Sequence, residues 1–241
     1  MRALWSFVAL PFVLLPIAFA WSTAEGQPRA SEGPLVLELF TSQGCSSCPS
    51  ADRLLAKLAT KGIEGRTLAP LSFHVDYWDD LGWPDPHGSP AWTERQREYA
   101  RTLRDGSVYT PQLVVGGSAG MVGSNLVAVT GAIAKAPRPA LLAATATWSK
   151  DTVEITTTAP ADADVIVAVW EDAPATKVKR GENSGETLGN DRVVRRLERV
   201  ARAGARGTIT VKIDPTWHSV GAVAFAQRTD RKIVASAFLS R

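Results

Sequence analysis

The spacing of apolar and polar residues changes near residue 140 and divides the chain into two unlike halves. Before that point, the apolar runs Leu35–Phe40 and Leu71–Val75 have the length and composition of buried strands. Between them, leucines in segment 51–59 recur at helical spacing, and a more polar helix is predicted over 91–103. This alternation predicts a parallel arrangement of the two strands.

A hairpin and a last helix complete the pattern of the first half. Strands are predicted over 112–115 and 121–122, on either side of the glycine-rich segment 116–120. A helix is then predicted from Ser124 as its cap through Ile133, because prolines follow shortly after it. The predicted order of elements is β-α-β-α-β-β-α up to about residue 136.

The second half carries short β-branched runs separated by polar, turn-rich segments. These runs are 152–158, 165–170, 208–213, 220–226 and 233–238. Segment 193–201 fits either a helical face or a strand, and we assign it to a strand because its neighbours are all β. The expected fold class is an α/β thioredoxin-like domain over 33–138 followed by an all-β, sandwich-like domain over 140–241.

The N-terminus has the pattern of a secretory signal peptide. Met1 and Arg2 precede the uncharged apolar stretch 3–19, and Ala18-Phe19-Ala20 is a small-x-small cleavage site. The alternative is an uncleaved membrane anchor, since the stretch approaches the length that spans a bilayer. We expect cleavage after Ala20, no stable membrane anchor afterwards, and a periplasmic or secreted protein in an oxidising compartment.

Charge says little about partners. The chain of 241 residues has a formal net charge of +3, and removal of Arg2 leaves 3 − 1 = +2. Segment 177–206 holds nine Lys or Arg against four Asp or Glu, which is typical of a solvated face. Without an aromatic-basic motif, no nucleic acid partner is expected.

The candidate chemistry lies in the two cysteines of the chain, Cys45 and Cys48, which flank Ser46-Ser47 directly after the first strand. A thiolate at the N-terminus of a helix is stabilised by free backbone N–H groups and by the helix dipole. The sequence therefore predicts that Cys45 attacks a substrate and that Cys48 resolves the mixed disulfide. The alternative is a structural disulfide without turnover. No resident cofactor or metal is expected.

The segment Tyr109-Thr110-Pro111, just before the strand at 112, together with the order of elements, resembles the thioredoxin superfamily over about 34–136. This resemblance implies a cis peptide bond before Pro111 and backbone hydrogen bonds from Thr110 to an extended substrate. It also implies a buried acid, Glu38, that handles the proton of the inner cysteine. Glu38 stands seven residues before Cys45, one more than the usual spacing. The alternative is a Glu38 paired with a basic neighbour.

The longer stretch 37–49 is similar to a family of exported proteobacterial proteins with a thioredoxin-like domain of unknown function. That family also carries a Gly-Glu-Asn segment and a Val-Val-Arg element, matched here by Gly181-Glu182-Asn183 and Val193-Val194-Arg195. We expect the first of these to fold over the cysteines. The resemblance names no substrate.

Segment 74–87 is rich in aromatic residues and follows the second predicted strand. His74 and Trp78 could wall a substrate groove, and His74 could tune the thiolate. The alternative is that both side chains only pack against the helix that follows.

These features predict a thiol-disulfide oxidoreductase that exchanges with a protein or small-thiol redox partner. Two alternatives stay open. A reduced Cys45 and Cys48 pair beside His74 is a soft site suited to copper(I) delivery. A noncatalytic, redox-sensitive binding protein would use the β-rich half to hold its partner.

Overall fold

The computed structural model describes residues 32–104 and 106–241. The predicted signal peptide, residues 1–20, lies outside the described residues and stays a prediction. Within the described residues, no helix is long and apolar enough to cross a membrane.

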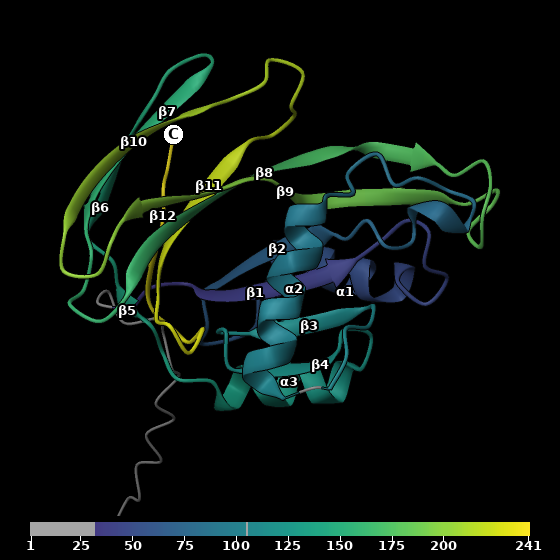
Figure 1. Cartoon of the computed structure of the whole chain (residues 1–241), viewed down its shortest axis with the longest axis horizontal. Coiled ribbons are helices and arrows are strands. Elements are labelled where there is room, and N and C mark those ends of the chain that lie inside the picture. The colour runs from purple at the N-terminus through teal and green to yellow at the C-terminus, as the bar shows by residue number, and fades with distance from the viewer. Residues whose placement is uncertain (1–31, 105) are drawn as a thin grey trace, which may run out of the picture.

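The elements of the first half follow the predicted order (Figure 1). They are β1 (Leu35–Thr41), α1 (Pro49–Lys61), β2 (Leu68–His74), the short 3-10 helix η1 (Asp79–Leu81), α2 (Pro90–Leu103), β3 (Gln112–Val115), β4 (Ala119–Val122) and α3 (Leu126–Lys135). α3 is capped by the side chain of Asn125, which accepts from the Ala128 N–H, rather than by Ser124. The strands β1 and β2 are parallel, as predicted.

The second half contains strands only. They are β5 (Ala140–Leu141), β6 (Ala144–Trp148), β7 (Thr152–Thr158), β8 (Asp164–Lys177), β9 (Thr187–Ala201), β10 (Arg206–Lys212), β11 (Gly221–Gln227) and β12 (Ile233–Phe238). The ambiguous segment 193–201 is a strand, because it forms the second part of the long β9.

One sheet of nine strands runs through both halves, in the order β4-β3-β1-β2-β9-β8-β11-β12-β5. A second sheet of three strands, β10-β7-β6, packs against its far end (Figure 1). The junction between the halves is the parallel pairing of β2 with β9, in which Ser72 stands opposite Val193. The hydrogen-bonded sheet is therefore not interrupted where the sequence pattern changes.

The hydrophobic core is also shared. One cluster of buried side chains joins Phe40 and Phe73 from the first half to Trp170, Val194 and Phe225 from the second. Burial of such large apolar side chains stabilises each by roughly 1.5–3 kcal/mol. Neither half could keep this core if the other were removed.

The predicted fold class, an α/β thioredoxin-like domain followed by a separate sandwich-like domain, is wrong. Strands account for 42% of the structure and helices for 19%, and the large curled sheet takes strands from both halves. The physical reason is that periodicity locates a strand and its buried face, whereas the pairing of β2 with β9 depends on residues far apart in the chain.

The two faces of β1 are covered by different helices. Leu35, Leu37 and Leu39 pack in a cluster with residues of α1, whereas Val36 and Phe40 pack with residues of α2. This follows from the period of two along a strand, which sends successive side chains to opposite faces. Odd-numbered residues of β1 therefore face α1, and even-numbered residues face α2.

Candidate active site

Cys45 and Cys48 form a disulfide in the turn that leads from β1 into α1. Cys48 is the N-cap residue of α1, and its carbonyl accepts hydrogen bonds from the N–H groups of Ala51 and Asp52, at 2.9 and 3.1 Å. Pro49 begins the helix, where its missing N–H costs nothing. Both cysteines are fully buried (0% exposed), although the intervening Ser46 and Ser47 are exposed. The disulfide is therefore shielded in this state.

Thr110, Pro111 and Trp78 lie beside the disulfide turn. The Thr110–Pro111 peptide bond is cis, as the resemblance implied. The Ser47 hydroxyl reaches the Thr110 carbonyl at 3.5 Å, and Trp78 Nε1 donates to Thr110 Oγ1 at 2.9 Å. Gly44 allows this approach, because a Cβ atom there would stand 3.0 Å from the Cβ of Trp78. The structure thus brings three of the predicted substrate-binding residues to the cysteines.

The loop between β8 and β9, residues 178–186, covers the disulfide turn, and we refer to it as the cover loop. Asn183 Nδ2 donates to the carbonyls of Gln43 and Cys45, at 2.9 and 3.0 Å. The Glu182 carboxylate accepts from the Ser46 N–H at 2.9 Å, and this hydrogen bond lowers the pKa of Glu182. The expectation that this Gly-Glu-Asn segment folds over the cysteines is confirmed.

Gly181 fixes the path of the cover loop. Its φ of +76° lies in the left-handed region that favours glycine. A Cβ atom at this position would also stand 3.0 Å from the Cβ of Trp83. Since Trp83 Nε1 in turn donates to Gln43 Oε1 at 3.1 Å, the cover loop and segment 82–85 are packed together over the turn.

His74 is buried at the end of β2, where its Nδ1 lies 2.7 Å from Asp85 Oδ2. Burial opposes the charged form of His74, but the charge of Asp85 and their hydrogen bond raise its pKa overall. Burial likewise opposes the charge of Asp85, whereas His74 and N–H donors from Gln43 and His87 lower its pKa to about 2. His74 is thus held by Asp85 rather than lining an open groove.

Asp52 belongs to the same side of the sheet, and sequence reasoning missed it. It stands in the first turn of α1, and its Oδ1 atom is buried without a hydrogen-bond partner among the described residues. Burial raises the pKa of Asp52 to about 6, although the charge of His74 acts in the opposite direction. The available signal was its spacing, four residues after Cys48 in a predicted helix.

Glu38 is on the other face of the sheet. Its carboxylate accepts from Arg95 Nε and from the Tyr99 hydroxyl, each at 2.5 Å, and Gln227 extends this buried network. Arg95 and Tyr99 belong to α2, whereas the cysteines lie in the turn that leads into α1. The geometry matches the alternative in which Glu38 pairs with a basic neighbour.

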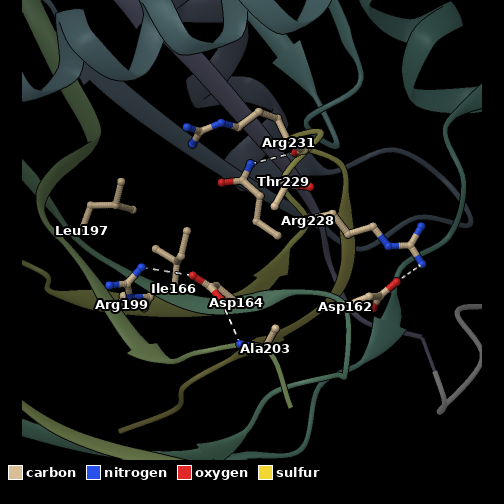
Figure 2. Close-up of a pocket in the computed structure, with 10 residues that line it drawn as sticks. Asp162, Asp164, Ile166, Leu197, Arg199, Ala203, Arg228, Thr229 and Arg231 are labelled. Carbon is tan, nitrogen blue, oxygen red and sulfur yellow. Dashed lines mark hydrogen bonds and ion pairs between the residues drawn. The ribbon is translucent and has the colours of Figure 1, made fainter. Parts of the chain in front are cut away.

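A separate groove of about 490 Å³ lies in the second half, and Figure 2 shows its lining. Ile166 and Leu197 supply its apolar surface. Four of its charged side chains pair with one another, Asp164 with Arg199 at 3.2 Å and Asp162 with Arg228 at 2.6 Å, whereas Arg231 pairs with Glu98 of α2. None of the predicted site residues lines this groove. Among the described residues, no group of three or more His, Cys, Asp or Glu side chains could hold a metal ion.

The fold and the site define a mostly β protein with a covered Cys-x-x-Cys disulfide at a strand-to-helix turn. The chain belongs to the family described as "Protein of unknown function (DUF1223)", which matches residues 36–227. No curated protein matches the chain.

Two solved structures share the fold. Protein AGR_C_4864 from Agrobacterium tumefaciens is 29% identical, with a TM-score of 0.65, over 87% of this chain and 96% of that one. HBP35 of Porphyromonas gingivalis is 16% identical, with a TM-score of 0.58, over 88% of this chain and 76% of that one. The match to the first structure supports the mostly β fold class.

Proposed function

We propose that this protein is a thiol-disulfide oxidoreductase that exchanges the Cys45–Cys48 disulfide with a dithiol partner. The observation that carries the proposal is the position of the disulfide at the N-terminus of α1, beside the cis Thr110–Pro111 bond. A leaving thiolate in this position is stabilised by the positive end of the helix dipole.

The proposed exchange moves two electrons and two protons. A partner thiolate attacks Cys45 Sγ, the Cys45–Cys48 bond breaks, and Cys48 leaves with the electron pair and takes up a proton. The second thiolate of the partner then attacks the mixed disulfide, forms the partner's own disulfide and releases Cys45, which is also protonated. The partner is oxidised and this protein is reduced, and the reverse sequence oxidises this protein.

The cover loop bears on how a partner gains access. Both sulfur atoms are buried, and Asn183 already occupies the carbonyls of Gln43 and Cys45. A partner must therefore displace the cover loop before its thiolate can reach Cys45. A partner strand that offers its own backbone N–H groups compensates for the lost hydrogen bonds, which favours a protein over a small thiol.

We further propose that the exchange takes place in an oxidising compartment, on the basis of the signal-peptide pattern of residues 1–20. His74 and Trp78 support the site through polar contacts, since His74 Nδ1 lies against Asp85 and Trp78 Nε1 donates to Thr110.

The reduction potential of the Cys45–Cys48 couple tests the proposal. The protein without residues 1–20 is equilibrated with glutathione and thioredoxin-type redox buffers, and the fraction of disulfide is measured by alkylation after denaturation. We expect a reversible couple between about −120 and −270 mV. A couple below about −300 mV would mark a structural disulfide and overturn the proposal.

A second readout uses Cys48→Ser with Cys45→Ser as its matched control. In the reverse direction, the Cys45 thiolate attacks a partner's disulfide and one partner thiolate leaves. Without Cys48 to resolve it, the mixed disulfide between Cys45 and the partner should accumulate. The Cys45→Ser control should give far fewer of them. Equal trapping by both variants would contradict the assigned roles.

A further inference from the structure

We infer that Asp52 is the proton-transfer residue of the Cys45–Cys48 couple, exchanging its carboxyl proton with the thiol of Cys48. The inference rests on the proposed function, because it assigns the proton that the exchange requires. It goes further in naming a residue that neither the cysteine motif nor the aromatic segment indicated.

The position of Asp52 in α1 is the first argument. Residues four apart on a helix lie on the same face, with Cβ atoms about 5–6 Å apart. The Asp52 N–H donates to the Cys48 carbonyl at 3.1 Å, so the turn that joins these two residues is helical. The side chains of Asp52 and Cys48 are therefore on the same face of α1, and the Asp52 side chain tilts toward the N-terminal end of the helix, where Cys48 lies.

The second argument is the unused hydrogen-bonding capacity of Asp52. Within the part of the chain that the structure describes, its buried Oδ1 atom has no partner in hydrogen-bonding geometry, and neither has Thr41 Oγ1, which lies near enough to lower the pKa of Asp52. Buried polar atoms without a partner are rare and call for an explanation. A carboxyl oxygen that is left free beside a redox-active thiol can give it a proton or take one from it.

The charged groups around Asp52 set the pH at which it works. His74 faces it from β2, Asp85 from segment 75–89, Arg53 from α1 itself, and Asp191 from β9 at a small pocket that Asp52 also lines. Burial outweighs the attraction of His74 and raises the pKa of Asp52 to about 6. The group thus changes protonation near neutral pH, as a proton-transfer residue requires.

The proton balance follows from these positions. When a partner thiolate opens the disulfide, the S–S bond breaks and Cys48 receives the electron pair, and the neutral Asp52 carboxyl then supplies the proton that converts Cys48 to a thiol. When Cys48 attacks in the reverse direction, the Asp52 carboxylate accepts that proton. The small pocket that Asp52 and Asp191 line is the route by which bulk solvent can restore the protonation state of Asp52 between turnovers.

The test measures the ionisation of Cys48 in a Cys45→Ser background. Ultraviolet absorbance of the thiolate is followed against pH, with and without Asp52→Asn. Removal of the nearby negative charge should lower the pKa of Cys48 by about one unit, since two interacting sites shift each other by that amount or more. Asp191→Asn is the matched control, because this exposed acid lies at the same pocket but not on α1, and it should leave the Cys48 pKa unchanged.

Two results would overturn the inference: an unchanged Cys48 pKa in Asp52→Asn, or an equal shift in Asp191→Asn. Should Asp52→Asn fail to fold, carbon-13 NMR of the Asp52 carboxyl in the unmodified protein decides the matter. Its pKa must change between the oxidised and the reduced protein, and a constant pKa would also overturn the inference.

These measurements do not require turnover, so they separate the inference from the proposed function. A protein whose Cys45–Cys48 couple is too reducing to exchange with the redox buffers, but whose Cys48 pKa depends on Asp52, would overturn the proposed function alone. A protein that exchanges thiols without any dependence on Asp52 would overturn the inference alone.

Discussion

Two buried or partly buried carboxyl groups lie on opposite faces of the central sheet, and they are held very differently. Glu38, on the face covered by α2, accepts from Arg95 and from Tyr99. Asp52, on the face covered by α1, keeps one buried oxygen without a partner. Burial alone does not make an acid chemically useful, because both carboxylate oxygens of Glu38 already accept hydrogen bonds, whereas Asp52 keeps an oxygen that can take a further partner.

The largest loss of stability should come from removing the ion-pair partner of Glu38. Arg95→Ala leaves the Glu38 carboxylate buried without its ion-pair partner, which should cost about 3–5 kcal/mol of unfolding free energy. Arg97→Ala is the control on the same helix. Since Arg97 is 55% exposed and lies 3.6 Å from an equally exposed Glu94, its loss should change stability by less than about 0.5 kcal/mol. Urea unfolding at neutral pH measures both variants, and similar losses would refute the contrast.

Substitution of Asp52, on the face covered by α1, should change the free energy of unfolding in the opposite direction. Burial holds the pKa of Asp52 at about 6 in the folded protein, above the value of 3.8 expected when it is unfolded. The folded state therefore binds this proton more tightly, and the stability of the native protein falls as the pH rises from about 4 through about 6. Asp52→Asn, which mimics the protonated acid, should gain about 1–2 kcal/mol at pH 8, after allowance for partial exposure of the side chain.

Unfolding free energies between pH 3.5 and pH 8 check this prediction, and the gain should vanish near the acid end of the range. A variant that loses stability at pH 8 would mean that Asp52 is stabilised in its charged form. The two faces of the sheet would then hold their carboxyl groups in the same way.

The smallest effect concerns the cover loop above the α1 face. Asn183→Ala removes two hydrogen bonds to the disulfide turn, and a net loss of about 1 kcal/mol should expose the disulfide about fivefold more often. The rate of reduction by dithiothreitol should rise by the same factor. Ser184→Ala is the control, because the Ser184 hydroxyl bonds only to Lys179 within the loop. Equal rates for the two variants would show that Asn183 does not hold the loop closed.

Much of the local structure could be predicted from the sequence, because helices and strands leave a periodic trace in neighbouring residues. The predicted strands 152–158 and 233–238 coincide with β7 and β12. The pairing of β2 with β9 leaves no such trace, since Ser72 and Val193 meet only in the folded chain. This one contact turns two expected domains into a continuous sheet.

The parts of the site whose geometry is fixed by a short motif could be predicted from the sequence. The parts that depend on which face of a strand or helix carries a side chain could not. The disulfide, the cis bond before Pro111 and the cover loop all follow from short sequence segments. Glu38 was assigned to the cysteines, but a single residue of spacing along a strand moves a side chain to the opposite face. Asp52 carried a weaker signal, its four-residue spacing from Cys48, which is meaningful only once the helix is known to start at Pro49.

The cover loop is also synthesised later than the cysteines that it shields. Asn183 lies 138 residues after Cys45, the residue whose carbonyl it binds. A ribosome adds roughly 5–20 residues per second, so the cysteines emerge many seconds before the loop that shields them. During this interval the nascent thiols meet whatever oxidants surround them without protection. A disulfide bond that forms in this interval consequently forms between unshielded cysteines, whereas every later exchange requires that the cover loop be displaced.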